Sequence, residues 1–178
     1  MVNTDKGKHI NAAFLYVAQV LKECQRLVYK IDSEMAPEWK NLYGNRITRD
    51  VSADLRRPDY WLIYGIFRYY ENDSDGLINK GINILLWDDY ILEEPIIIAG
   101  KILYKDTSKR NHWDLWSIWH EWESVEDSNE YQTNGKLNYF ESDEQEYIDK
   151  ACVFSWPLVS ISDDEALLEK VVAPLKDL

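Results

Sequence analysis

The fold class is decided by residues 61–104, which read WLIYGIFRYYENDSDGLINKGINILLWDDYILEEPIIIAGKILY. This stretch contains three apolar runs, at 61–70, 77–87 and 96–104, with the composition of strands. The first run is apolar or aromatic on both faces, which suits a central strand covered on two sides. A turn cluster at 72–76 and a short linker at 88–95 separate the runs, so consecutive strands can pair antiparallel. We therefore predict a three-stranded meander.

A long helix is predicted before the meander, over residues 10–31. Its apolar residues recur at spacings of three and four, which is the helical period. These residues are Ile10, Phe14, Val17, Leu21, Cys24, Val28 and Ile31. After it, Pro37 is expected to open a short second helical turn that ends near Gly44.

A Trp-rich helix is predicted after the meander, over residues 112–123. Asn111 is a good N-cap for it, and Trp recurs in it at 113, 116, 119 and 122. A helical wheel places most of these indoles on the apolar side but Trp113 on the polar side. Trp113 is therefore expected at the surface.

The C-terminal part is predicted to add a hairpin and a strand to the sheet. Residues 131–139 carry Asn134-Gly135, the signature of a type I′ hairpin turn. Residues 151–161 form an apolar strand, which Pro157 should confine to a sheet edge or a bulge.

The chain is predicted to end in an amphipathic helix over residues 163–178, with Pro174 disturbing its last turn. Capping boxes are expected at Ser142 with Gln145 and at Ser162 with Glu165. Together these elements predict one α+β domain over residues 1–178, with an antiparallel sheet and helices mainly on one face.

Charge is distributed very unevenly along the chain. Residues 1–110 carry 16 Lys and Arg against 16 Asp and Glu, whereas residues 111–178 carry 4 against 16. The C-terminal part thus holds the entire net charge of −12. Ten of its carboxylates lie between Glu121 and Asp149. Such an anionic field repels nucleic acid and attracts cationic surfaces, so it bears on partners rather than on fold.

The acidic segment 121–149 is the predicted partner-binding site. Carboxylates steer a basic partner, and exposed aromatic residues supply central anchors. A solvated face that merely keeps the protein soluble is the alternative interpretation. The predicted contact residues are Glu121, Glu123, Glu126, Asp127, Glu130, Tyr131, Tyr139, Glu141, Asp143, Glu144, Glu146 and Trp113.

The loop 46–57 is the one basic feature. Its arginines, Arg46, Arg49, Arg56 and Arg57, could bind a phosphate or carboxylate through their forked guanidinium groups. Alternatively, they pair with Asp50, Asp54 and the acidic C-terminal third and hold the loop on the domain.

The sequence contains no motif that fixes a reaction. His112 and His120 stand eight residues apart on one predicted helix, a rise of about 12 Å, so they cannot share a metal ion. We expect neither a metal nor a cofactor. The leading hypothesis is a small, acidic, non-catalytic protein that blocks the basic, nucleic-acid-binding surface of a protein partner, in the manner of an inhibitor, immunity or anti-defence protein.

Two other hypotheses remain open. One is an enzyme or ligand-binding domain that acts on an anionic small molecule or phosphate through the 46–57 loop. The other is a structural subunit of a larger complex. Residues 1–8 lack the apolar segment of a secretory signal, and the longest apolar runs are about six residues, so we predict a cytoplasmic protein that does not enter membranes. The net charge of −12 predicts that it does not contact nucleic acid directly.

Overall fold

The α+β fold class is confirmed by a computed structural model of the protein. It describes residues 3–49, 51, 54–56, 58–87, 93–125, 133–141 and 146–178. Contacts within the chain divide it into two units, Met1–Glu34 and Met35–Leu178. Each unit is described by itself.

The first unit is formed by helix α1 (Asn3–Met35), which starts earlier and ends later than the predicted 10–31. The helix continues through Asp32 and Ser33, where the sequence suggested a break. A single turn containing Pro37 follows α1, closed by the hydrogen bond from the Trp39 N–H to the Met35 carbonyl at 3.0 Å, but the predicted extension to near Gly44 is wrong, because the chain enters a strand at Lys40. A proline just after a helix end is common, since it cannot continue the helical hydrogen bonding.

The second unit is built on an antiparallel sheet with the order β1-β3-β4-β5-β7-β6, and β2 also pairs with β3. The predicted meander is confirmed as β3, β4 and β5. The first of these strands starts at Gly65 rather than Trp61, because Pro58–Trp61 forms a short 3₁₀ helix. The strands are β1 (Lys40–Asn41), β2 (Thr48–Arg49), β3 (Gly65–Asn72), β4 (Asp75–Leu85), β5 (Ile96–Tyr104), β6 (Asn138–Glu141) and β7 (Ile148–Pro157).

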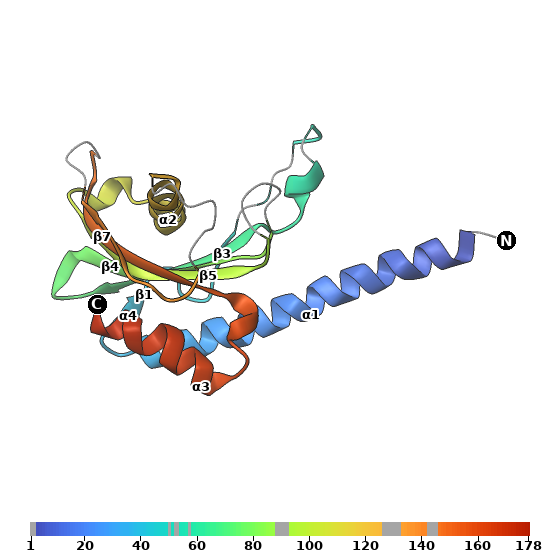
Figure 1. Ribbon diagram of the computed structural model, residues 1–178, viewed down its shortest axis with the longest axis horizontal. Helices are drawn as coiled ribbons and strands as arrows, with labels where there is room; N and C mark the ends of the chain where they lie inside the picture. Colours follow the sequence, from blue (N-terminus) through green and yellow to red (C-terminus); the bar gives the residue numbers. More distant parts are fainter. Residues whose placement is uncertain are drawn as a thin grey trace. The chain divides into compact units, whose positions relative to one another are not determined.

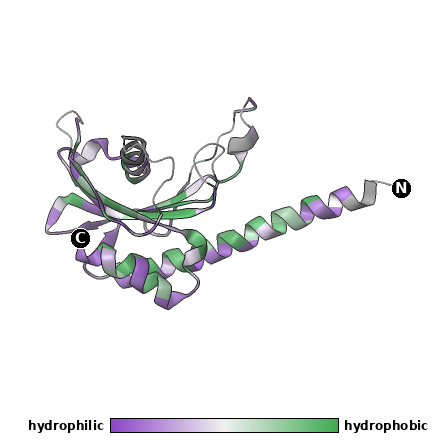
Figure 2. Cartoon of the chain, viewed as in Figure 1, coloured by the Kyte–Doolittle hydropathy of each residue, from purple (hydrophilic) through white to green (hydrophobic). Residues whose placement is uncertain are grey.

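Both faces of the sheet are covered within this unit, so the prediction of helices mainly on one face is wrong. Helix α2 (Asp114–Val125) lies on one side of the sheet and the C-terminal helix on the other (Figure 1). The cause is the strand composition: side chains alternate between faces, and Phe67 and Tyr69 on one face are as fully buried as Tyr70 and Ile82 on the other. Figure 2 shows hydrophobic colouring along the central strands.

The C-terminal helix runs through three segments, α3 (Asp164–Leu167), a π-helical turn (Leu168–Val172) and α4 (Ala173–Asp177). The π-helical turn ends at Val172, two residues before Pro174, which has no N–H to continue the α-helical ladder. The N-cap of α3 is Asp163, whose carboxylate accepts a hydrogen bond from the Ala166 N–H at 2.8 Å. The predicted Ser162 cap is therefore displaced by one residue.

Two lysines hold the end of this helix against the sheet. Lys80 and Lys101 are partners in register on β4 and β5. The Lys80 ammonium donates to the Lys176 carbonyl at 2.7 Å, and Lys101 donates to the Leu178 oxygen. Burial, followed by the charge of Lys101, lowers the pKa of Lys80. Cations placed at a helix C-terminus interact favourably with its exposed carbonyls.

The type I′ turn predicted at Asn134-Gly135 is wrong. Of the described residues, only Gly44 and Gly135 have positive φ, whereas a type I′ turn needs it at both central positions. A Cβ on Gly135 would collide with the indole of Trp156, so this glycine is required by close approach. The partner of β6 is β7, and Tyr131, Ser142 and Gln145 lie outside the described residues.

Pro157 ends strand β7 rather than placing it at the sheet edge. Strand β7 lies between β5 and β6. Pairing with β6 reaches only as far as Val153, so Pro157 pairs with Ile96 of β5 but has no partner residue in β6. Its missing N–H therefore costs no ladder hydrogen bond to β6.

Candidate functional site

The first turn of α2 is fixed to the sheet by a buried polar network around Asp114. Its carboxylate accepts hydrogen bonds from the hydroxyls of Tyr104 and Tyr147, each at 2.8 Å, and from the Asn111 N–H at 2.8 Å. The Leu115 N–H donates to the hydroxyl of Tyr69 at 3.0 Å. The network satisfies N–H groups that a helix start leaves without helical partners.

Burial keeps two phenols of this network protonated. It raises the pKa of Tyr69 and of Tyr104 well above the ordinary range of a phenol. Both hydroxyls therefore remain protonated, and the Tyr104 hydroxyl remains a donor to Asp114. A network that is fully satisfied in this way holds the start of α2 rigidly.

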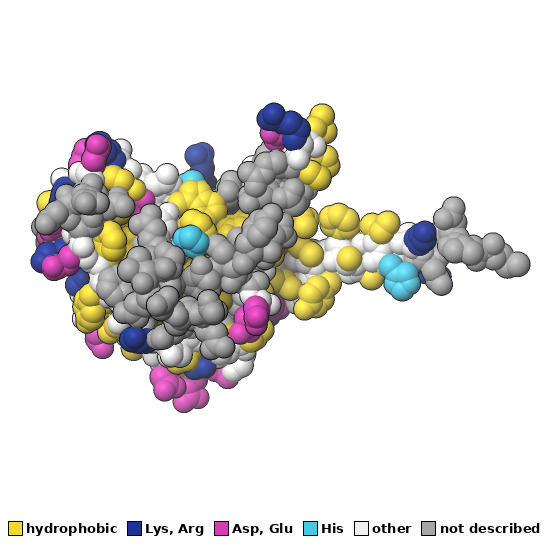
Figure 3. All heavy atoms as spheres, turned by 45° about the horizontal axis from the view of Figure 1, so that its top comes forward, with side chains coloured by type: hydrophobic (Ala, Val, Ile, Leu, Met, Phe, Trp, Pro, Cys, Tyr) yellow, Lys and Arg dark blue, Asp and Glu magenta, His cyan; other side chains and the backbone are white. Residues whose placement is uncertain are grey.

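A cluster of aromatic side chains surrounds the start of α2, and we call it the aromatic surface. Tyr64 and Phe67 form its buried base, while the other five rings are half-buried. Figure 3 shows hydrophobic and histidine side chains gathered together on this face. The members of the aromatic surface are Tyr64, Phe67, Trp87, His112, Trp113, Trp116 and His120.

Trp113 lies at the centre of the aromatic surface. Its ring centroid is 4.6 Å from that of Phe67, and 5.4 Å from those of Tyr64 and Trp116. The helical-wheel placement of Trp113 on a polar side is wrong, because α2 starts at Asp114 and the wheel does not apply to the residue before it. Sequence reasoning thus found Trp113 but missed its partners, which come from three other segments.

Helix α2 connects the aromatic surface to the acidic segment. The Trp116 and His120 rings stack with their centroids 4.9 Å apart, and the next residue, Glu121, is the first of the acidic segment. Both Glu121 and Glu123 belong to α2. The backbone of α2 therefore continues from the half-buried rings of Trp116 and His120 into the first residues of the acidic segment, whose side chains from Glu121 onward in α2 lie outside the described part of the structure.

In the described part of the acidic segment, the exposed side chains include Tyr139 and Glu141 of β6 and Glu146 before β7. Tyr139 is 64 % exposed. Glu141 pairs with Lys150 at 2.6 Å, and Glu146 pairs with Lys109 at 2.8 Å. The hydrogen bond from Lys109 lowers the pKa of Glu146. The predicted contact residues Glu126, Asp127, Glu130, Tyr131, Asp143 and Glu144 lie outside the described residues.

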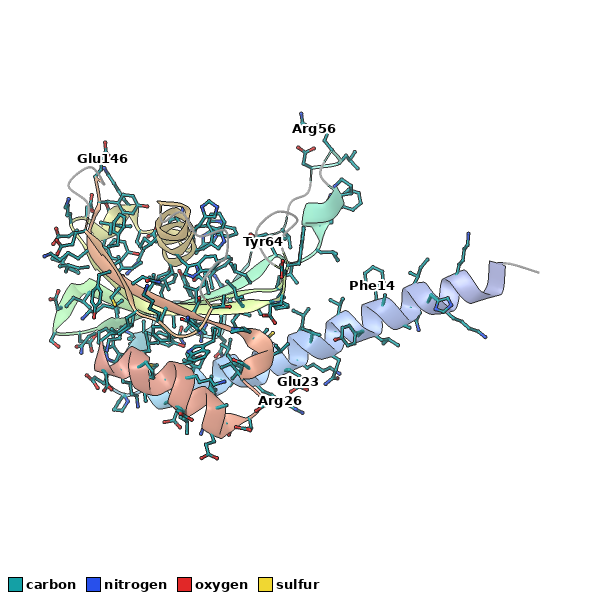
Figure 4. The ribbon with its side chains drawn as sticks, in the orientation of Figure 1. Phe14, Glu23, Arg26, Arg56, Tyr64 and Glu146 are labelled. Atoms are coloured by element: carbon teal, nitrogen blue, oxygen red, sulfur yellow. The ribbon has the colours of Figure 1, made fainter. Side chains whose placement is uncertain are left out.

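The arginine loop shows local pairing where it is described. The Arg56 guanidinium donates to both oxygens of Asp54, from Nε at 3.0 Å and from Nη2 at 2.7 Å. This pair projects into solvent, away from the sheet and from Tyr64 (Figure 4). Arg46 is exposed, while the side chain of Arg49 and all of Arg57 lie outside the described residues. The described pairing thus involves an acid of the loop itself.

The cation that holds this loop is Arg68, which sequence reasoning missed. Arg68 is buried in β3 and donates from Nη1 to the Arg46 carbonyl at 2.6 Å and from Nη2 to the Gly44 carbonyl at 2.7 Å. The available signal was a single arginine inside a strand that is apolar on both faces.

Within the described ranges, no group of His, Cys, Asp and Glu side chains is arranged to hold a metal ion. In the same ranges, no helix combines the length and apolar character needed to cross a bilayer.

Comparisons with protein-family models, curated proteins and solved structures give no match to this chain.

Proposed function

We propose that this protein is a non-catalytic binding protein that uses its acidic segment to cover the basic surface of a protein partner. The partner surface is one that binds nucleic acid, and covering it inhibits the partner. The observation that carries the proposal is the continuity of α2, which leads from the half-buried rings of Trp116 and His120 directly into Glu121. The proposed role is of the inhibitor, immunity or anti-defence kind.

Each half of this surface supplies a different part of binding. Interface centres are enriched in large aromatic residues, and Trp113 and Trp116 already have their rings ordered by neighbouring side chains. Ordered rings lose little entropy on association. The carboxylates of the acidic segment would accelerate encounter with a cationic surface and disfavour neutral or anionic partners.

The proposal places the protein in the cytoplasm. Both cysteines are free, and Cys152 is buried in β7. Burial raises the pKa of the Cys152 thiol, which suits a small apolar core residue rather than a reactive group. Unpaired thiols are usual in reducing compartments.

The proposal is tested by neutralising the acidic segment. Glu126, Asp127, Glu130, Glu141 and Glu144 are changed together to Gln or Asn. The tagged parent is used to capture its partner from extract of the native cell, and the purified partner is titrated with parent and variant at low and high salt. We expect the variant to bind at least about tenfold more weakly, and parent binding to weaken as salt rises. The partner should bind nucleic acid more weakly when the parent protein is bound to it.

A matched control removes five carboxylates elsewhere. Glu38, Asp73, Glu93, Glu94 and Glu169 are exposed and lie outside residues 121–149. Their joint neutralisation changes the net charge equally, so it should leave most of the affinity intact. Equal losses in the two variants would mean that total charge alone attracts the partner. Unchanged binding in the first variant would reduce the acidic segment to a solubilising surface.

A further inference from the structure

The apolar residues of α1 form a strict heptad pattern. From Ile10 onward they are separated alternately by four and three residues, without a break, to the end of the helix. A repeat of 3.5 residues, rather than 3.6, is the pattern of helices that wind around another helix. We call these positions the α1 seam: Ile10, Phe14, Val17, Leu21, Cys24, Val28, Ile31 and Met35.

The N-terminal half of the α1 seam is exposed to solvent. Ile10 is 61 % exposed, Phe14 is 63 % exposed and Val17 is 37 % exposed. Figure 4 shows the side chain of Phe14 projecting from the helix. Between His9 and Lys22 the helix has no charged residue on any side. Large apolar groups concentrated in this way mark an interaction surface.

We propose that residues 10–21 of α1 pack against the same segment of a second copy of this chain, forming a two-stranded coiled coil. The seam supplies its core, with Phe14 and Leu21 at one core position of the heptad and Ile10 and Val17 at the other. Both a parallel and an antiparallel pairing place apolar residues opposite one another.

The positions beside the seam favour an identical partner. In coiled coils, charges at these flanking positions select the partner, and like charges there oppose self-pairing. Here the flanking residues are Asn11, Ala13, Ala18 and Val20, none of which is charged. Two copies of this segment therefore meet without repulsion, and the small alanines allow close approach.

The charge of the helix as a whole also permits self-association. Residues 3–35 carry five Lys and Arg and four Asp and Glu, so the acidity of the chain lies elsewhere. Charged side chains beyond Leu21 pair within the helix, as Arg26 does with Glu23 at 3.0 Å. A membrane-surface helix would instead carry a strongly basic polar face, which residues 10–21 lack.

The area available reaches the lower end of what a specific dimer needs. Covering the seam and its flanks over three turns would remove about 500 Å² of surface per helix, or about 1,000 Å² in total. We therefore expect a dimer that dissociates on dilution. Leu15 and Tyr16 fall outside the seam and would stay at the rim, where single exposed apolar residues are ordinary.

The test compares two neighbouring substitutions in the full chain by sedimentation and light scattering over a range of protein concentrations. Phe14→Glu places a charge in the seam, and Leu15→Glu places the same charge one residue away, at an equally exposed side chain. We expect the parent and Leu15→Glu to show the mass of a dimer at high concentration. Phe14→Glu should raise the dimer dissociation constant at least about tenfold.

Circular dichroism establishes whether each variant is folded. If Phe14→Glu is unfolded, the test is repeated with Val17→Glu in the seam and Tyr16→Glu as the off-seam control. A parent that is monomeric at every concentration would overturn the proposal. So would equal losses in seam and off-seam variants, because they would indicate non-specific apolar contact. Dimers that survive both seam substitutions would place the interface elsewhere.

Discussion

At the scale of single residues, Arg68 is one of the few charged residues that are buried in the described part of the protein. It is only 3 % exposed and lies among aromatic and aliphatic residues of β3, where a charged side chain is unusual. Its guanidinium donates hydrogen bonds to the carbonyls of Gly44 and Arg46 in the 44–46 turn. A planar, forked cation suits two acceptors at once, which the single ammonium of lysine does not.

We predict that Arg68→Met lowers the free energy of unfolding by about 2 to 4 kcal/mol, because two carbonyls lose buried charged donors. Arg68→Lys should recover only part of the loss. Urea unfolding followed by Trp fluorescence measures both changes. Arg56→Met is the control, since its ion pair with Asp54 is exposed and such pairs contribute little. Equal effects of Arg68→Met and Arg56→Met would contradict the assigned role of Arg68.

At the scale of elements, the packing of α2 on the sheet depends on a glycine of β4, Gly81. Gly81 of β4 and Gly100 of β5 are partners in register at the centre of the sheet. A Cβ on Gly81 would come within 2.9 Å of the Leu115 side chain and 2.8 Å of the Tyr69 ring. Gly81 therefore provides the space in which Leu115 of α2 is fully buried, whereas a Cβ on Gly100 would meet Cys152 and Val153 of β7.

Gly81→Ala is predicted to lower the free energy of unfolding by about 1 to 3 kcal/mol through overpacking, and to shift α2 away from β4. Gly76→Ala is the matched control in the same strand, because a Cβ there meets nothing within 4 Å. Thermal unfolding and the near-ultraviolet circular dichroism of the tryptophans report stability and packing. A Gly81→Ala protein as stable as the parent would show that the core accommodates the methyl group without strain.

For the whole molecule, the uneven charge lowers the free energy of unfolding but strengthens binding to a basic partner. Carboxylates concentrated in residues 121–149 repel one another in the folded state. Salt screens that repulsion over about 8 Å at physiological ionic strength, and it screens the attraction of a basic partner in the same way.

We expect added salt to raise the free energy of unfolding by up to about 1 kcal/mol while it weakens partner binding. Urea midpoints at a series of sodium chloride concentrations measure the first effect. The protein with Glu126, Asp127, Glu130, Glu141 and Glu144 neutralised should respond less to salt than the parent. An identical salt response in both proteins would locate the destabilising repulsion outside the acidic segment.

Local pattern was enough to predict the long N-terminal helix, the meander and the α+β class. The reason is that periodicity and turn chemistry act between residues close in sequence, as along residues 96–104, where prediction and strand coincide. The same holds for the Trp-rich helix, although it starts at Asp114 rather than at His112; Asn111 accepts a hydrogen bond from the Trp113 N–H at 3.1 Å in the turn before it.

Tertiary structure alone decided the features that join distant segments. The aromatic surface combines rings from before β3, from β3, from after β4, from the turn before α2 and from α2, so its membership depends on strand register rather than on spacing alone. Arg68 is buried because its strand is covered on both faces and the 44–46 turn brings carbonyls to it. Gly135 likewise lies against the indole of Trp156, which leaves no room for a side chain there, and Asn134-Gly135 does not form the type I′ turn that its sequence favours. By itself the sequence determined the elements and where the charge lies, because these follow from neighbouring residues, whereas the fold determined which side chains meet.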